Sequence, residues 1–190
     1  DQGQKNKYER ILSKIKKGEI LEIGCGWGSF AINAAQQGNF VNCLTLSKEQ
    51  AKYAQEKINQ NNLTDKIKIN IQDYRNEKNQ YDSIVSIEMF EAVGREYWEK
   101  YFKCLSNCLK DGGKAVIQTI TIDEDIYDGY KNRFDFIQKH IFPGGFLPSV
   151  KIFEDLAKNH GLKVEDKFSF AKDYQRTLLI WLKNFDKQKS

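Results

Sequence analysis

The sequence predicts an α/β fold with a doubly wound, mostly parallel sheet. Strand-like and helix-like segments alternate five times along the chain, which is typical of parallel strands joined by crossover helices. A glycine-rich turn at 24–28 follows the first short strand directly. A length of 190 residues suits one compact core. We therefore expect a single domain over residues 1–190.

The elements are placed by hydrophobic period and by helix-capping residues. Ser47 opens the third helix as an N-cap, and Gly38 closes the second. Predicted strands cover 20–23, 40–46, 67–71, 81–87, 114–120 and 162–168. Predicted helices cover 5–16, 29–37, 47–62, 97–109, 149–159 and 173–185.

The segment 123–148 has no clean period, although it is rich in aromatic residues and holds both prolines, Pro143 and Pro148. An irregular segment of this length inside a compact domain is usually functional. We expect a lid-like insertion here.

Composition and charge exclude several classes of protein. The net charge of +4 is mild and the lysines are scattered, so nucleic acid is not indicated. No apolar run approaches the length of a membrane span, and no leader precedes the first helix, which predicts a cytoplasmic chain with reduced cysteines. Cys104 and Cys108 lie four apart, but a zinc site needs three or four ligands. Buried structural thiols, and no metal, are the better interpretation.

The glycine turn reads G-x-G-x-G, from Gly24 to Gly28. A dinucleotide site requires G-x-G-x-x-G and an acidic residue at the tip of the second strand, but Ser29 replaces the third glycine and that strand ends in Thr45-Leu46-Ser47. The G-K-[ST] of a phosphate-binding loop is also missing. A turn that serves only tight packing remains an alternative; otherwise a nucleoside ligand without phosphates is indicated.

Six ordered segments resemble the cyclopropane-fatty-acyl-phospholipid synthase and mycolic acid cyclopropane synthase family of class I S-adenosylmethionine-dependent methyltransferases. Residues 21–28, LEIGCGWG, are similar to the first motif of that family. The other segments are 45–50 (TLSKEQ), 72–75 (QDYR), 86–94 (SIEMFEAVG), 118–120 (QTI) and 136–145 (FIQKHIFPGG). The resemblance covers nearly the whole chain and implies a Rossmann-like methyltransferase fold with S-adenosylmethionine as cofactor.

The resemblance also implies which residues hold the cofactor. Gln50 would bind the ribose, and Asp73 would accept a hydrogen bond from the adenine amino group, although a turn residue is the alternative for Asp73. Glu22 would orient the glycine loop or the cofactor amine. The full implied set is Glu22, Gly24, Cys25, Gly26, Gly28, Thr45, Leu46, Gln50, Gln72, Asp73, Tyr74 and Ile87.

The reaction that the resemblance implies adds the cofactor's methyl group to the cis double bond of a phospholipid acyl chain and closes a cyclopropane ring. Its proton acceptor in the family is a bound bicarbonate, and the implied catalytic residues here are Glu91, Gln118 and Tyr174. Many relatives have a histidine where Gln118 stands, and glutamine cannot titrate. Aromatic faces stabilise a carbocation. Candidates, each with packing as the alternative, are Phe90, Tyr127, Tyr130, Phe134, Phe136 and Phe142.

The resemblance predicts further segments, one with a bicarbonate-binding cysteine before Asp1 and a helical stretch and strand after Ser190. The chain is therefore expected to be a core fragment or a shortened relative that binds cofactor better than it turns over. The expected partner is a phospholipid acyl chain at the inner face of a membrane, with peripheral association, and a homodimer is left open. A small-amine methyltransferase and a non-catalytic S-adenosylmethionine-binding module are the alternatives.

Overall fold

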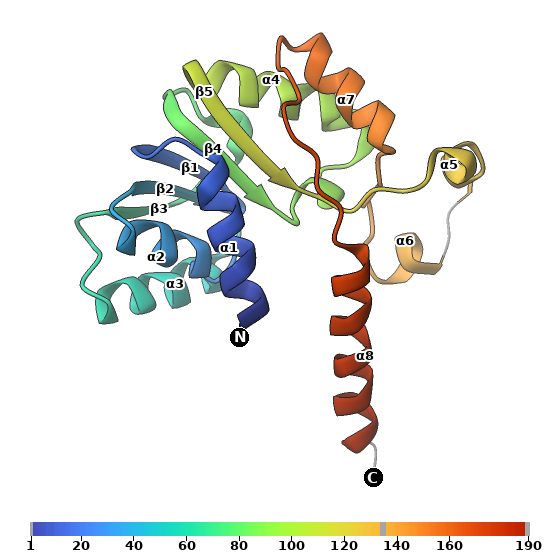
Figure 1. The fold of residues 1–190 in the computed structure, drawn as a ribbon, viewed down its shortest axis with the longest axis horizontal. Coiled ribbons are helices and arrows are strands. Elements are labelled where there is room, and N and C mark those ends of the chain that lie inside the picture. Colours follow the sequence, from blue (N-terminus) through green and yellow to red (C-terminus); the bar gives the residue numbers. More distant parts are fainter. Residues whose placement is uncertain (1, 134–135, 189–190) are drawn as a thin grey trace.

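A parallel five-stranded sheet forms the centre of the molecule (Figure 1). The computed structural model describes residues 2–133 and 136–188, and within them the strand order is β3-β2-β1-β4-β5. The central strand β1 pairs in parallel with β2, where Leu21 lies opposite Asn42, and with β4, where Leu21 lies opposite Ile84. The strands are β1 (Glu19–Ile23), β2 (Phe40–Thr45), β3 (Ile67–Ile71), β4 (Tyr81–Ile87) and β5 (Leu109–Gln118). The predicted parallel sheet is confirmed.

Helices cover both faces of the sheet. The α-helices are α1 (Gln2–Lys14), α2 (Ser29–Gln36), α3 (Lys48–Gln60), α4 (Trp98–Cys108), α5 (Glu124–Tyr130), α6 (Phe136–His140), α7 (Val150–Asn159) and α8 (Ala171–Lys187). Three short 3₁₀ turns are η1 (Tyr74–Asn76), η2 (Phe90–Ala92) and η3 (Arg95–Tyr97). The predicted N-cap is confirmed, because Gln50 N donates to Ser47 Oγ over 3.2 Å. Ser149 caps α7 in the same way, with Ile152 N at 3.3 Å.

The alternation of side chains along each strand divides the core into two clusters. Leu21 and Ile84 point to the face that α4 and α7 cover, whereas Ile20 and Val85 point to the face that α1, α2 and α3 cover. This is the period of two that a strand buried on both faces requires. The carboxyl ends of all five strands consequently meet at one edge, between the two layers.

The predicted strand at 162–168 is wrong. Residues 162–170 pair with no strand of the described sheet. The segment is held from its sides instead: Asp166 pairs with Lys14 at 2.8 Å, and Phe168 lies 3.6 Å beneath the guanidinium of Arg10. Glu165 also pairs with Lys114 of β5 at 2.6 Å and Lys167 with Glu154 of α7 at 2.6 Å, so the segment is held by side-chain contacts and not by ladder hydrogen bonds.

Two short helices, α5 and α6, occupy the segment predicted as a lid-like insertion, beside the sheet, and α8 projects away from the body of the molecule (Figure 1). Residues 134–135 of that segment lie outside the described residues. A lid function remains a prediction. Across residues 2–133 and 136–188, no helix is both long and apolar enough to cross a membrane.

Candidate functional site

The glycine loop lies at the carboxyl end of β1, fixed by hydrogen bonds to β2. Gly24 N and Cys25 N both donate to Leu44 O, at 2.9 and 3.0 Å. Gly24, Gly26 and Gly28 all have positive φ, which only glycine adopts readily. A Cβ on Gly24 would approach Met89 to 2.8 Å and one on Gly28 would approach Ala54 to 2.8 Å. Packing alone therefore requires two of these glycines.

Gly26 differs from its neighbours because a Cβ built on it meets no atom within 4 Å. The backbone at Gly26, with φ of 52°, thus borders open space at the loop's tip. A ligand can approach the main chain there, which is the second use of glycine in such loops.

Glu22 lies under the loop, in β1, and is only 3% exposed. Cys43 Sγ, on β2, is 3.7 Å from its carboxylate. Burial raises the pKa of Glu22 well above its ordinary value, and the neighbouring Cys25 adds to the effect. The raised pKa favours the protonated carboxyl group, which can donate a hydrogen bond as well as accept one.

The predicted ribose side lies at the end of β2. Thr45 Oγ1 donates to Gln50 Oε1 over 3.2 Å and accepts from Ser47 N at 3.2 Å. Gln72 joins this group, because Gln72 N donates to Thr45 O over 3.1 Å. Leu46 is exposed beside them. The structure thus brings these residues together at the ends of β2 and β3.

Asp73, on the predicted adenine side, is engaged by Arg75. Asp73 Oδ1 accepts from Arg75 N and Nε at 2.9 Å, and Oδ2 lies 2.6 Å from Nη2. The guanidinium holds the pKa of Asp73 below its usual range. Asp73 is the N-cap of η1, so it has the turn role that the sequence analysis gave as the alternative. Its contact with adenine remains a prediction. Burial raises the pKa of neighbouring Tyr74 to about 12, so its hydroxyl stays protonated.

Glu91 stands in η2, just beyond the end of β4. Its Oε1 accepts from Ile120 N, whereas Oε2 is buried and has no hydrogen-bond partner among the described residues. Burial raises the pKa of Glu91, and the carboxylate of Glu88 adds to the effect, whereas hydrogen bonds from Ile120 N–H and from the Thr119 hydroxyl oppose it. A carboxylate with one anchored and one unpartnered oxygen is well placed to act as a base.

Gln118 ends β5, opposite Ile87 of β4. Its Nε2 donates to Glu88 Oε1 over 2.6 Å, and its Oε1 is buried without a partner in the described structure. Tyr174, in the first turn of α8, is near enough to Glu88 and Glu91 that both carboxylates, after burial, raise the pKa of its phenol. The three predicted catalytic residues therefore share one neighbourhood, and Ile87 stands at its base.

Glu88 is the site residue that the sequence did not identify. It directly follows β4 in the left-handed region, with φ of 52°, which is unfavourable for a non-glycine residue. Besides Gln118 it contacts Lys7 Nζ at 3.4 Å. Glu88 lies within the segment 86–94 that resembles the family's active-site motif, but only Glu91 of that segment was assigned a catalytic role from the sequence.

Other predicted features lie elsewhere. Phe90 is a core residue, Tyr127 is buried, Tyr130 packs on Phe146, Phe136 and Phe142 are exposed, and Phe134 lies outside the described residues. Cys104 and Cys108 are buried 3.9 Å apart. The described residues hold no group of three or more His, Cys, Asp or Glu side chains that could bind a metal.

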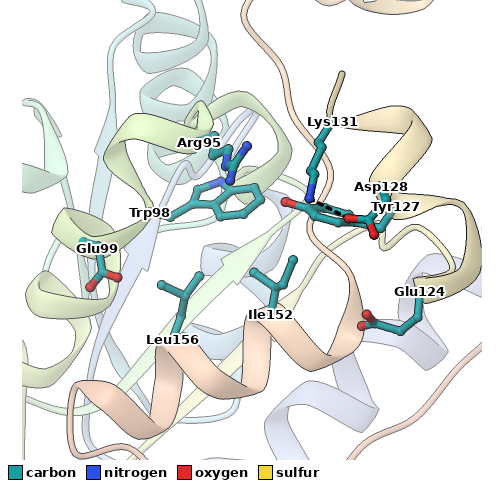
Figure 2. A pocket seen from close by; sticks show the side chains of 9 residues that line it. All are labelled: Arg95, Trp98, Glu99, Glu124, Tyr127, Asp128, Lys131, Ile152 and Leu156. Carbon is teal, nitrogen blue, oxygen red and sulfur yellow. Dashed lines mark hydrogen bonds and ion pairs between the residues drawn. The ribbon is translucent and has the colours of Figure 1, made fainter. Parts of the chain in front are cut away.

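A pocket of about 490 Å³ lies between α4, α5 and α7, away from the glycine loop (Figure 2). Arg95 and Trp98 face Tyr127 and Lys131 across it, and Ile152 and Leu156 form its floor in that view. None of the predicted cofactor-binding or catalytic residues lines this pocket, and of the aromatic candidates only Tyr127 does so among the described residues.

The sheet order, the crossover helices and the glycine loop together define the class I methyltransferase fold. The cyclopropane synthase MmaA2 from Mycobacterium tuberculosis superposes with a TM-score of 0.87 at 26% identity, covering 98% of this chain and 70% of that one. The cyclopropane synthase CmaA1, solved with S-adenosylhomocysteine (SAH) and CTAB, superposes with a TM-score of 0.85 at 27% identity, with the same 98% and 70% coverage.

Sequence comparison gives the family. Residues 1–190 match the family described as mycolic acid cyclopropane synthetase, and the chain belongs to that family. It is 38% identical to the tuberculostearic acid methyltransferase UfaA1 of Mycobacterium tuberculosis, over 96% of this chain and 44% of the relative. It is 36% identical to the cyclopropane-fatty-acyl-phospholipid synthase of Escherichia coli, over 97% of this chain and 47% of that enzyme. The chain thus spans roughly half the length of these relatives.

Proposed function

We propose that this chain is the catalytic core of an S-adenosylmethionine-dependent methyltransferase that acts on the cis double bond of a phospholipid acyl chain. The observation that carries the proposal is the match of the whole chain to the family. The relatives include both a cyclopropane-fatty-acyl-phospholipid synthase and a tuberculostearic acid methyltransferase. The product is accordingly a cyclopropane or a methyl-branched acyl chain.

The residues at the ends of β1, β2 and β3 fit S-adenosylmethionine. The open space above Gly26 admits the ligand to the backbone. Gln50 and Thr45 would hold the ribose, Asp73 the adenine, and Glu22 the loop itself. When bound, the cofactor supplies an electrophilic methyl group on a positively charged sulfur.

The fit of these residues to a bicarbonate ion is less direct. An anion needs hydrogen-bond donors, but the two buried unpartnered atoms at this point, Glu91 Oε2 and Gln118 Oε1, are acceptors. The carboxylates of Glu88 and Glu91 also lie close enough together to affect each other's charge. Donors to a bicarbonate ion would come from the hydroxyls of Thr119 and Tyr174, which lie near Glu91, and the proposal does not require this ion.

An acyl substrate agrees with the apolar surface beside the site. Both α6 and α8 expose large apolar side chains, among them Ile137, Ile141, Leu179, Trp181 and Phe185. Such surface is typical of membrane or protein contact. The proposal includes a cytoplasmic location and peripheral association with the inner face of a membrane. The chain would act there as a monomer or as a homodimer.

Calorimetric titration with S-adenosylmethionine, and separately with NAD, tests the cofactor. Micromolar binding of the first alone is expected; binding of neither contradicts the proposal. The acyl acceptor is tested with vesicles of cis-unsaturated phospholipid and methyl-labelled cofactor, followed by mass spectrometry of the released fatty acids. Both experiments use this chain and any longer natural chain that contains it, because the relatives are about twice as long.

The alternatives give different results. Label on a small amine and none on lipid would indicate an amine methyltransferase. Tight cofactor binding without turnover of either acceptor would indicate a binding module.

A further inference from the structure

The pocket between α4, α5 and α7 combines an apolar floor with charged walls, and the site at the strand ends does not use it (Figure 2). Its volume of about 490 Å³ is in the range of small-molecule sites in proteins. Ile152 and Leu156 of α7 form the floor, and the indole of Trp98 lies above them in that view. One part of a ligand bound here would therefore be apolar.

The acidic side chains of the pocket already have partners. Glu99 lies 3.2 Å from His160 Nε2, Glu124 accepts from a backbone N–H of α7 at 3.0 Å, and Asp128 pairs with Lys131 at 2.5 Å. A cationic ligand would have to compete with these contacts.

Two hydrogen-bond donors on one wall of the pocket have no acceptor. Trp98 is only 3% exposed, and its Nε1–H is buried without a partner among the described residues. The exposed guanidinium of Arg95 lies 5.9 Å from the ring centre of Phe146 and forms no ion pair within the part of the chain that the structure describes. A buried N–H without an acceptor is costly, and a guanidinium prefers phosphate or carboxylate partners. The hydrogen-bonding capacity left in this pocket is therefore that of donors.

A hydroxyl across the pocket shows where positive charge converges. Burial raises the pKa of the Tyr127 phenol, whereas the charges of Arg95 and Lys131 lower it. Both cations therefore act at one point of the pocket. A group bound there would meet guanidinium, ammonium and phenol donors, a set that suits an anion and disfavours a cation.

Phe146 links the pocket to the site at the strand ends. Its ring contacts that of Trp98, with centroids 5.8 Å apart, and its backbone N–H donates to Glu91 O over 2.9 Å. A head group bound in the pocket would place the start of its acyl chain close to the segment that carries Glu91.

We propose that this pocket binds the anionic head of an amphiphile, with the anion held by Arg95 and Trp98 Nε1 and the apolar part held by the α7 floor. The occupant is the phosphate group of the phospholipid substrate, so the inference deepens the proposed function and rests on it. Phosphate suits the pocket because its oxygens can accept from a guanidinium, an indole N–H and an ammonium group together.

The three tryptophans of the chain provide a test that does not depend on turnover. Each indole N–H gives one NMR signal, so that Trp98 reports the pocket, Trp27 the glycine loop and Trp181 the exposed face of α8. Dihexanoyl phosphatidylglycerol below its micelle concentration should shift the Trp98 signal saturably, with little change at Trp181. Dihexanoylglycerol, which has the same chains and no phosphate, should leave Trp98 unchanged.

The control ligands separate the possible sources of the anion. Inorganic phosphate and decanoate should each shift the Trp98 signal at least tenfold more weakly than the phospholipid at equal concentration. Absence of a saturable shift with the phospholipid, or an equal shift with dihexanoylglycerol, would overturn the proposal. An equal shift with inorganic phosphate or with decanoate would also overturn it, because the occupant would then be a free anion or a fatty acid.

A matched pair of variants tests the role of the guanidinium. Arg95→Gln should weaken binding of dihexanoyl phosphatidylglycerol about tenfold in calorimetry. It should also raise KM for the phospholipid about tenfold, with kcat within about twofold of the wild type and the dissociation constant of S-adenosylmethionine unchanged. The control is Lys100→Gln, which removes the same charge from an exposed position of α4 that does not line the pocket. Equal losses in both variants, or no loss in Arg95→Gln, would refute the role of Arg95.

The results also separate this inference from the proposed function. A chain that methylates phospholipid without any change at Trp98 on lipid binding would refute the pocket assignment alone. A chain that binds no S-adenosylmethionine would refute the proposed function, and with it the assignment of the occupant as a substrate.

Discussion

The sheet region, residues 19–118, and the C-terminal region, residues 121–188, use apolar residues differently. In the sheet region, aromatic and aliphatic side chains such as Phe90, Tyr101 and Ile84 are fully buried in two clusters. In α8 no residue is buried, although its sequence contains Leu178, Leu179, Ile180, Trp181 and Leu182. In the second region α7 joins the core through Leu156 and Ala157, whereas α8 presents apolar surface that the described chain does not cover.

The site lies where the two regions meet. Glu91 belongs to the sheet region, and its backbone carbonyl accepts from Phe146 N of the C-terminal region at 2.9 Å. Tyr130 holds the next residue, because Leu147 N donates to its hydroxyl over 3.0 Å. The rigid strand ends can thus keep the carboxylates fixed while the neighbouring helices contact a substrate.

The largest expected effect is on core stability. Phe90 is 0% exposed and packs against the rings of Trp98, Tyr101, Phe102 and Phe153. Phe90→Ala should lower the free energy of unfolding by about 3–5 kcal/mol, measured by urea denaturation. Trp181→Ala in α8, an equally drastic truncation, should change it by no more than about 0.5 kcal/mol. A large loss in Trp181→Ala would mean that α8 is covered in solution.

Local physics explains why the sheet could be predicted from the sequence. The strand 67–71 alternates β-branched apolar and polar residues, and 81–87 carries apolar residues around its centre, so the bounds predicted for both agree with the structure. Ser47 satisfies an otherwise unpaired N–H, which makes a helix start visible in the sequence. The order of these elements along the chain then restricts the sheet to a few possible topologies.

Contacts between distant segments explain what could not be predicted. The segment 162–168 has strand-like alternation, but its partners include Lys14 and Arg10 of α1 and Lys114 of β5, which are distant in the sequence. The resemblance led to Glu91, Gln118 and Tyr174, yet Glu88 was missed because its backbone strain and its bond with Gln118 appear only in three dimensions.

The second prediction compares glycines in the two regions. Gly26→Ala and Gly161→Ala each place a methyl group in open space at positive φ, so each should cost about 1 kcal/mol of stability. Only Gly26→Ala should weaken S-adenosylmethionine binding, by about tenfold or more, because its methyl group occupies the proposed ligand space. Equal affinities of the two variants in calorimetry would place the cofactor elsewhere.

The third prediction concerns pH. The pKa of Glu22 is raised by burial above its ordinary 4.5, so the stability that its protonated form provides is present below that value and lost as pH rises through the folded-state pKa. Glu22→Gln should therefore be more stable than the wild type at pH 8, by about 1 kcal/mol, and similar to it at pH 4. The control is Glu19→Gln, at the exposed start of the same strand. A pH-independent difference for Glu22→Gln would contradict the burial argument.

The smallest expected effect tests how the C-terminal region is attached. Arg10 lies 3.6 Å above the ring of Phe168 and 3.7 Å from Asp166, both in the segment that pairs with no strand. These exposed contacts are each worth about 0.5–1 kcal/mol, so Arg10→Ala should lower the free energy of global unfolding by less than about 1 kcal/mol. The same change should loosen the segment locally, because no ladder hydrogen bonds hold it and the ion pairs that remain, Lys14–Asp166, Lys114–Glu165 and Lys167–Glu154, are exposed. Hydrogen exchange and limited proteolysis should therefore show faster opening at 162–170 with unchanged protection in β1 and β4. Slower or unchanged exchange at 162–170 would mean that other contacts fix the segment, and the contrast between the two regions would then be weaker than their burial indicates.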